Sequence, residues 1–201
     1  MKKILTIVTL TKNNPDQLIR TLKSLKKYTK IIKYSKLILI DGSNDNFFIE
    51  NKKIYKIFDS LYDLLIVKEK GKGIYAAMNT ALYLTKSDYL LFMNSGDQFS
   101  ERFDENLILN KLLENSLNDE INLIYCRAKI KSNINNKLDY FNPAKFIGNK
   151  KKKLLPYLVP PSHQACFFKS KWHKKNYYDL DKGYRADRII IKKSLKNSIF
   201  V

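Results

Sequence analysis

The sequence of 201 residues is short of several residue types, and each shortage narrows what the protein can be. Its two cysteines, Cys126 and Cys166, are far apart in the sequence and show no metal-binding spacing such as C-x-x-C, so we predict two buried free thiols. No apolar run approaches the roughly 18–20 residues that span a bilayer. The apolar start, Ile4–Leu10, is interrupted by Thr6 and Thr9, and no small-residue cleavage site follows it. We therefore expect a buried strand there and a cytoplasmic protein.

Acidic residues and arginine are also scarce. The chain has 38 basic and 19 acidic residues, which gives a net charge of +19. Five of the basic residues are arginine, namely Arg20, Arg102, Arg127, Arg185 and Arg188. An AT-rich genome produces such a lysine-rich mixture without functional selection. Sequence-specific nucleic-acid readers favour arginine, and single-strand binders interleave aromatic with basic residues, so we expect no nucleic-acid partner.

One basic cluster is dense. Lys150–Lys153 is followed at once by the apolar segment Leu154–Leu158. Basic residues beside apolar ones suit a membrane surface that carries anionic lipid. A solvated loop is the simpler interpretation of the cluster taken alone, and a peripheral contact with the inner face of the cytoplasmic membrane is the alternative.

Apolar strands alternate with amphipathic helices along the first half of the chain. We predict strands at Ile4–Leu10, Lys36–Ile40, Leu64–Val67 and Tyr89–Met93, and helices from Pro15, over Phe47–Phe58 and over Ile74–Leu84. This alternation is typical of a mostly parallel sheet with right-handed crossovers. Because the strands are almost continuously apolar, helices should cover both faces of the sheet.

The second half of the chain is less regular. We predict a helix at Leu107–Leu117, strands at Leu123–Cys126 and Gln164–Phe168, and a terminal helix at Ala186–Leu195. Residues Ala128–Lys131 could pair with the strand before them, as a hairpin or an extension. The segment Ser132–Lys153 is polar and should be irregular. The length fits one domain better than two.

Each of the four main strands ends in a small polar cluster. The clusters are Thr11–Asn13, Asp41–Ser43, Gly71–Gly73 and Asn94–Asp97. Ligands of open α/β sheets bind beyond the carboxyl ends of the strands, so four such clusters on one edge indicate a site.

Asp97 is the best candidate for a metal ligand at that edge. A divalent cation can bridge a carboxylate to the phosphate oxygens of a nucleotide, and Gly96 leaves room for a ligand to approach. The alternative is that Asp97 caps the next helix. Gly71-Lys72-Gly73 is a weak phosphate signal, because it lacks the rest of a P-loop, and a plain strand-to-helix turn is the simpler interpretation.

Several stretches resemble motifs of the family 2 glycosyltransferases, which have the GT-A fold. Ile7–Asn14, with Thr21-Leu22 and Ser24-Leu25 downstream, is similar to their I-V-T-x-T-[YK]-N opening, and Leu39–Asp45 resembles their uridine-contacting loop. Lys72–Asn79 and Ser87–Asp97 resemble the patterns K-G-I-Y-D-A-M-N and G-D-Y-[IL]-x-F-L-N-S-G-D. These two mark a bacterial branch associated with capsule, lipopolysaccharide and colanic-acid-like polysaccharides. Pro161–Ala165 with Phe167-Phe168, and Ala186-Asp187, resemble its [FC]-x-H-Q-[AS]-x-F and A-D-Y-[ED] motifs.

This resemblance, which runs from about Ile4 to Lys193, implies a fold and an activity. The fold is α/β, a GT-A (Rossmann-like) α/β/α sandwich with a mostly parallel central sheet. It forms one domain over residues 1–201, with a nucleotide-sugar-binding half at 1–100 and a C-terminally short acceptor-binding half at 101–201. The activity is inverting transfer of a sugar from a nucleotide-diphosphate sugar, a UDP-sugar, to a saccharide or lipid-linked saccharide in surface polysaccharide biosynthesis.

The resemblance also assigns roles to residues. Asp97 matches the metal-binding carboxylate, for Mn²⁺ or Mg²⁺, and Asp187 matches the general base that deprotonates the acceptor hydroxyl. His163 and Gln164 match acceptor-side residues. The expected donor-binding residues are Thr9, Thr11, Asn13, Asp41, Ser43, Lys72, Asn79, Asn94 and Ser95. Without the resemblance, His163 would be a hydrogen-bonded structural histidine and Asp187 a carboxylate on a helix surface.

Some positions depart from the family pattern. Gly71 and Ala76 stand where the family has aspartates, Arg188 follows Asp187 where it has tyrosine, and the Asp41 loop is one residue shorter. Family members also carry a further segment after the A-D motif. The alternative to an active transferase is therefore a degenerate member that binds nucleotide or partner proteins without turnover.

Overall fold

The computed structural model describes residues 2–59, 62–69, 72–131, 140–142 and 159–201. Four parallel strands form one half of a seven-stranded sheet: β1 (Leu5–Thr11), β2 (Ser35–Asp41), β3 (Leu64–Lys68) and β4 (Tyr89–Phe92), in the order β3-β2-β1-β4. All seven residues of β1 are buried, as its apolar sequence predicts for a central strand. These strands confirm the predicted parallel sheet.

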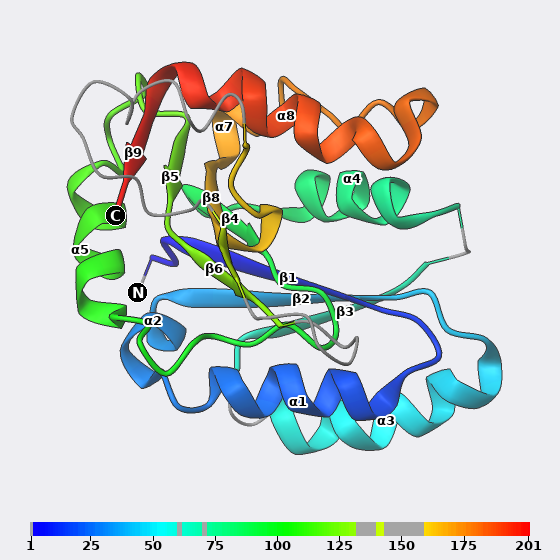
Figure 1. The fold of residues 1–201 in the computed structure, drawn as a ribbon. Coiled ribbons are helices and arrows are strands. Elements are labelled where there is room, and N and C mark those ends of the chain that lie inside the picture. The colour runs from blue at the N-terminus through cyan, green and yellow to red at the C-terminus, as the bar shows by residue number, and fades with distance from the viewer. Residues whose placement is uncertain (1, 60–61, 70–71, 132–139, 143–158) are drawn as a thin grey trace.

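Helices cover both faces of this sheet (Figure 1). On one face lie α1 (Pro15–Leu25), α2 (Thr29–Lys33), α3 (Asp45–Asp59) and α5 (Glu105–Glu114), and on the other lie α4 (Ile74–Leu84) and α8 (Ala186–Ser194). Helix α1 begins with Pro15 at its first turn, and the Asn14 side chain accepts a hydrogen bond from the backbone N–H of Gln17. Its Leu18, Leu22 and Leu25 are fully buried against the sheet. The predicted α/β/α sandwich is confirmed.

The second half of the chain completes the sheet. Strand β8 (Cys166–Lys169) pairs antiparallel with β4 on one side and with β5 (Leu123–Tyr125) on the other, and β9 (Ser198–Phe200) pairs with β5. Between β8 and α8 lie α7 (Ser170–His173) and the 3-10 helix η2 (Leu180–Arg185), and two shorter 3-10 helices are η1 (His163–Ala165) and η3 (Leu195–Asn197).

The pairing of one short strand differs from the prediction. Strand β6 (Ala128–Ile130) does not pair with β5, and instead forms a separate two-stranded sheet with β7 (Tyr140–Asn142). The segment predicted to be irregular, Ser132–Lys153, therefore contains a strand at 140–142; its remainder lies outside the described residues. Three alternating residues do not specify a partner, because a short strand pairs with whichever edge the chain brings beside it.

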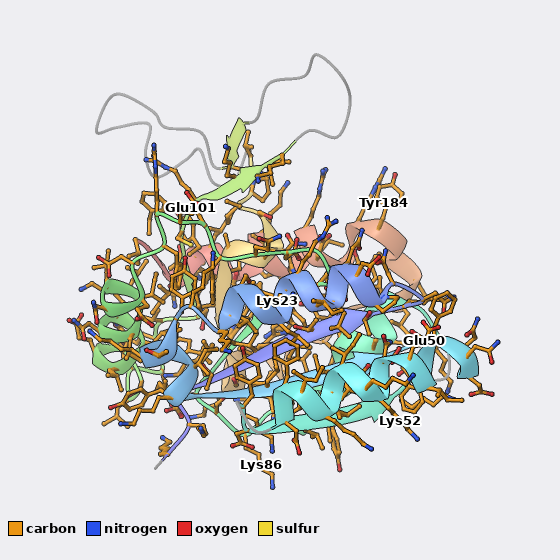
Figure 2. The ribbon with its side chains drawn as sticks, turned by 90° about the horizontal axis from the view of Figure 1, so that it is seen from below. Lys23, Glu50, Lys52, Lys86, Glu101 and Tyr184 are labelled. Atoms are coloured by element: carbon orange, nitrogen blue, oxygen red, sulfur yellow. The ribbon has the colours of Figure 1, made fainter. Side chains whose placement is uncertain are left out.

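The surface lysines are spread over the fold. Figure 2 shows Lys23 on α1, Lys52 on α3 and Lys86 after α4, so these charges come from three separate elements. Within the ranges given above, no helix is long and apolar enough to cross a membrane. The cluster Lys150–Lys153 and its proposed membrane contact lie outside the described residues.

Candidate active site

The carboxyl ends of the parallel strands meet at one edge of the sheet. The pairing register sets Thr11 beside Asp41 and Asp41 beside Lys68, and the turn after β4 joins them because the N–H of Ser95 donates to the carbonyl of Leu10 at 2.9 Å. The predicted grouping of the clusters after β1, β2 and β4 is therefore correct. Of the cluster after β3, Gly71 lies outside the described residues, and Lys72 and Gly73 lead into α4.

The loops after β1 and β2 are tied together. The N–H of Asn13 donates to Ser43 Oγ at 2.8 Å, and the Asn13 side-chain oxygen accepts from the N–H of Asn44 at 3.0 Å. Asn13 has a φ of 50°, in the left-handed region that asparagine tolerates better than most residues. Asn13 and Ser43, both predicted donor-binding residues, thus hold one loop against the other.

Asp41 is fully buried at the end of β2. One carboxylate oxygen accepts from the N–H of Ser43 at 2.8 Å, and the other accepts from Asn51 Nδ2 at 2.9 Å and from the Tyr55 hydroxyl at 2.6 Å. Burial, and then the bond to Asp41, raise the pKa of Tyr55 far above its usual 10.0, so its hydroxyl stays protonated and donates. Asp41 therefore orders the β2–α3 loop from within. Sequence reasoning missed Asn51 and Tyr55, whose four-residue spacing on a helix was the available signal.

The turn after β4 holds the carboxyl group of Asp97 in a half-buried position. The N–H of Asn94 donates to Asp97 Oδ2 at 2.8 Å, and the N–H of Asp97 donates to the carbonyl of Asn94 at 2.9 Å. Gly96 has a φ of 99° and lies against the side chain of Gln17 on α1. Burial raises the pKa of Asp97 to about 6, against the smaller opposing effect of the Asn94 N–H.

Asp97 does not cap the next helix. Helix α5 starts at Glu105, and its cap is Asp104, whose side chain accepts from the N–H groups of Asn106 and Leu107 at 3.0 Å each. The helix-cap alternative for Asp97 was therefore wrong. Capping of α5 does not explain why the Asp97 side chain is partly buried.

Several buried polar atoms near this edge have no hydrogen-bond partner among the described residues. They are the hydroxyls of Thr9, Thr11 and Ser95 and the side-chain oxygen of Asn94. Buried polar atoms are nearly always paired, so such a group indicates a place for a ligand or water. Thr9 differs from the other three residues because it lies within the central strand and is 0% exposed, so a bound nucleotide sugar could not reach its hydroxyl.

Helix α4 begins at the same edge. Its N-cap is Gly73, with a φ of 97°, and Lys72 before it is exposed. Asn79, predicted to bind the donor, uses both ends of its amide on the backbone of Tyr178, donating to the carbonyl at 2.9 Å and accepting from the N–H at 3.0 Å. In this structure Asn79 joins α4 to the segment before η2.

A cavity of about 310 Å³ brings the predicted acceptor-side residues together. Asp187, His163 and Gln164 all line it, with Arg188 beside them and Asn142, Val159, Pro160, Pro161, Ser162 and Ile191 completing the wall. Asp187 lies in the first turn of α8, half-buried, and accepts from the N–H of Arg188 at 2.7 Å. The pKa of Tyr75 on α4 is raised by burial and then by the charge of Asp187, so the two side chains are close. Sequence reasoning missed this neighbour.

His163 is buried, as its structural interpretation requires, and lines the cavity, as its acceptor-side interpretation requires. Burial, and then the neighbouring His173, lower its pKa to about 3, so the ring is neutral at neutral pH. Its burial and hydrogen bonds confirm the structural interpretation, and its acceptor-side role stays a prediction.

A model of the family described as Glycosyl transferase family 2 matches residues 6–175. The chain belongs to this family. The family 2 chain is 32% identical over 108 residues to the poly(ribitol-phosphate) beta-N-acetylglucosaminyltransferase TarP of Staphylococcus aureus (strain N315). That match covers 53% of this chain and 32% of TarP.

Solved structures give the same fold. A Staphylococcus aureus TarS fragment, residues 1–349, has a TM-score of 0.69 at 14% identity, and the match covers 100% of the family 2 chain and 58% of the fragment. The mannosyltransferase PcManGT from Pyrobaculum calidifontis, solved with GDP-Man and Mn²⁺, has a TM-score of 0.67 at 12% identity, covering 100% and 55%. The chain spans less than two thirds of each of these relatives, and at such identities the likeness shows the GT-A fold alone.

The family resemblance places a divalent metal at this edge. The residues present fit a metal ion that the protein shares with the phosphates of a bound substrate. The described residues contain no group of three or more His, Cys, Asp or Glu side chains that could hold an ion. Mg²⁺ and Mn²⁺ are, however, often bound through one or two carboxylates together with substrate phosphates. Asp97, with the unpaired oxygens of Asn94 and Ser95 close by in the chain, fits an ion that arrives with a diphosphate.

Proposed function

We propose that this family 2 chain is an inverting glycosyltransferase that moves a sugar from a nucleotide-diphosphate sugar to a hydroxyl group of a surface polysaccharide or its lipid-linked precursor. The observation that carries the proposal is the cavity in which Asp187 meets His163 and Gln164. These three residues come from two separate segments of the chain, and the family motifs assign all of them to the acceptor side.

The donor would lie along the carboxyl ends of β1, β2 and β4. Asn13 and Ser43 connect two of the loops there, and Asp41 holds the second loop from beneath. A divalent ion held by Asp97 would neutralise charge on the departing diphosphate. Support for a UDP-sugar comes from TarS, whose fragment was also solved with UDP-GlcNAc, at a TM-score of 0.67 and 15% identity.

Asp187 would be the base. In inverting transfer, one carboxylate on the side opposite the leaving nucleotide is sufficient to remove the proton from the attacking hydroxyl. Asp187 is half-buried and lines the cavity, so it can reach a bound hydroxyl. The domain would act as a single unit, with residues 1–100 holding the donor and 101–201 the acceptor.

The acceptor to test first carries phosphate. Arg188 lines the cavity next to Asp187, and Arg185 lies three residues before it, in a chain with five arginines in all. Arginine matches the geometry of phosphate oxygens better than lysine does. TarP, by its name, acts on poly(ribitol phosphate), which makes a phosphodiester-linked polyol chain a suitable probe.

The test is sugar transfer and donor hydrolysis with a panel of nucleotide sugars, with and without Mn²⁺. We expect activity from the wild type, loss of both reactions in Asp97→Ala, and loss of transfer in Asp187→Asn with donor binding kept. The exposed Asp181→Asn, six residues before Asp187, is the matched control and should be fully active. Nucleotide binding without hydrolysis or transfer from any donor would instead identify a degenerate binding protein.

A further inference from the structure

The chain has two histidines, and both bind the same hydroxyl group. Tyr178 OH lies 2.6 Å from His163 Nε2 and 3.0 Å from His173 Nε2. All three side chains are buried, with exposed fractions of 4%, 0% and 2% for His163, His173 and Tyr178. They come from η1, α7 and the segment before η2. The fold therefore brings them together as one line of hydrogen-bonded side chains, His163–Tyr178–His173, surrounded by aromatic rings.

The direction of every hydrogen bond in this line can be worked out from one end. His173 Nδ1 lies 2.9 Å from the backbone carbonyl of Asn176, which can only accept, so Nδ1 carries the proton. Burial lowers the pKa of His173 to about 4, so the ring is neutral and its Nε2 is bare. Tyr178, whose pKa burial raises well above 10.0, keeps its proton and donates it to that nitrogen.

The position of the proton on His163, at the other end of the line, follows in the same way. The single hydroxyl proton of Tyr178 is committed to His173, so the hydroxyl oxygen must accept from His163, and His163 carries its proton on Nε2. The ring is neutral, so His163 Nδ1 is a bare acceptor. That nitrogen is buried and has no hydrogen-bond partner among the described residues.

An unpaired buried acceptor is unfavourable unless something donates to it. Rotating the ring to hide Nδ1 would break the bond to Tyr178, and Phe92, stacked on the ring at 5.0 Å between centroids, opposes that rotation. His163 is also one of the residues that line the cavity with Asp187. The place where a donor can arrive is therefore the cavity wall.

We propose that His163 Nδ1 accepts a hydrogen bond from a hydroxyl group of the acceptor bound in this cavity, directly or through one bound water, and that Tyr178 and His173 are positioning residues that hold His163 in the required tautomer. This extends the proposed function, because it adds a specific hydroxyl-recognition atom to the acceptor side. It gives His163 no part in proton removal, which stays with Asp187.

Nitrogen-15 NMR of histidine-labelled protein tests the tautomers without any substrate. A bare imidazole nitrogen and one that carries a proton resonate far apart, and two histidines give four ring signals. We expect protonated Nδ1 for His173 and protonated Nε2 for His163, with Tyr178→Phe leaving His173 unchanged and releasing His163 into a mixture of tautomers. Tyr177→Phe, at the exposed neighbouring position, is the control and should change neither. Protonated Nδ1 on His163 in the wild type would overturn the proposal.

The second arm uses poly(ribitol phosphate) as the probe. Its binding should shift the His163 Nδ1 signal. Tyr178→Phe should raise the acceptor KM by the inverse of the fraction of His163 that keeps its proton on Nε2, about twofold for an even mixture of tautomers, while the control Tyr177→Phe keeps the wild-type KM. If the probe is glycosylated while the Nδ1 signal stays fixed, the inference is wrong. If the wild type neither hydrolyses nor transfers any donor sugar, the proposed function fails, and the hydroxyl-recognition role fails with it. The tautomer measurement still tests the hydrogen bonds among His163, Tyr178 and His173, because it needs no substrate.

Discussion

Replacing Asp97 by asparagine should stabilise the protein while removing its activity. The carboxyl group lies in a half-buried position, and burial raises its pKa from the usual 3.8 to about 6. At neutral pH the folded state must therefore hold an ionised group that would be better solvated in the unfolded chain. Asparagine keeps an oxygen that can accept from the N–H of Asn94, as Asp97 Oδ2 does at 2.8 Å, and carries no charge.

The size of the effect follows from the pKa. The rise to about 6 corresponds to about 3 kcal/mol of lost unfolding free energy once the group is ionised in both states. A raised carboxyl pKa means that the folded state binds the proton more tightly, so stability falls as the pH rises through the window from 3.8 to about 6. Asp97→Asn should thus gain about 3 kcal/mol at pH 8 and only about 1 kcal/mol at pH 4.5.

Urea denaturation of both proteins at the two pH values measures this difference. Asp63→Asn, at an exposed position, is the control and should change the unfolding free energy by less than about 0.5 kcal/mol. Adding UDP with Mn²⁺ should stabilise the wild type and leave the Asp97 variant unchanged, because ligands stabilise only the state that binds them. An equal gain at both pH values, or no gain at pH 8, would refute the argument that a desolvated carboxylate lies in this turn.

Three further predictions concern the framework of the site. Tyr55→Phe removes a hydrogen bond to a buried carboxylate and should lower the unfolding free energy by about 1.5–3 kcal/mol, whereas Tyr62→Phe, which loses a bond to a backbone carbonyl, should cost about 1 kcal/mol. Equal losses would contradict a stronger hydrogen bond from Tyr55 to the Asp41 carboxylate. Gly73→Ala should cost about 1–3 kcal/mol because of its φ of 97°, while Gly42→Ala, which has no such φ and only ordinary contacts, should cost much less when both are measured by urea denaturation. Asn79→Ala should destabilise by about 2–4 kcal/mol through two lost bonds to the backbone of Tyr178, and an unchanged stability with a raised donor KM would instead favour its predicted role at the donor.

The first half of the fold was predictable because its signals are local. The helix predicted at Ile74–Leu84 has the same bounds in the structure. Strands β1 and β2 differ from their predicted ranges by one residue at each end, and β3 and β4 by one residue at one end. Each of these strands is a mostly apolar run bounded by polar turn residues, which is enough to define it. The partner of β6 and the strand β9 were not predictable, since three-residue strands depend on what the rest of the chain places beside them.

The arrangement of the candidate site was predictable at the level of segments and less so at the level of atoms. The polar clusters after β1, β2 and β4 do share one edge of the sheet, and the residues that the family motifs assign to the acceptor, Asp187 and His163, line one cavity. The internal partners of the site residues were missed. Tyr178 is an example: a tyrosine fifteen residues after His163 carries no pattern that marks it as a hydrogen-bond partner, and the pairing exists only once the chain has folded.

The position of β8 has a consequence for how the protein is made. One edge of β4 pairs with β1, which the ribosome has already produced, but the other edge pairs with β8, which ends at Lys169, more than seventy residues later. During synthesis the apolar strand Tyr89–Phe92 therefore has an open edge, and such edges promote aggregation. Residues 1–100, the predicted nucleotide-sugar-binding half, would not be expected to stay soluble as a separate fragment, since the strand that completes their sheet comes from residues 101–201.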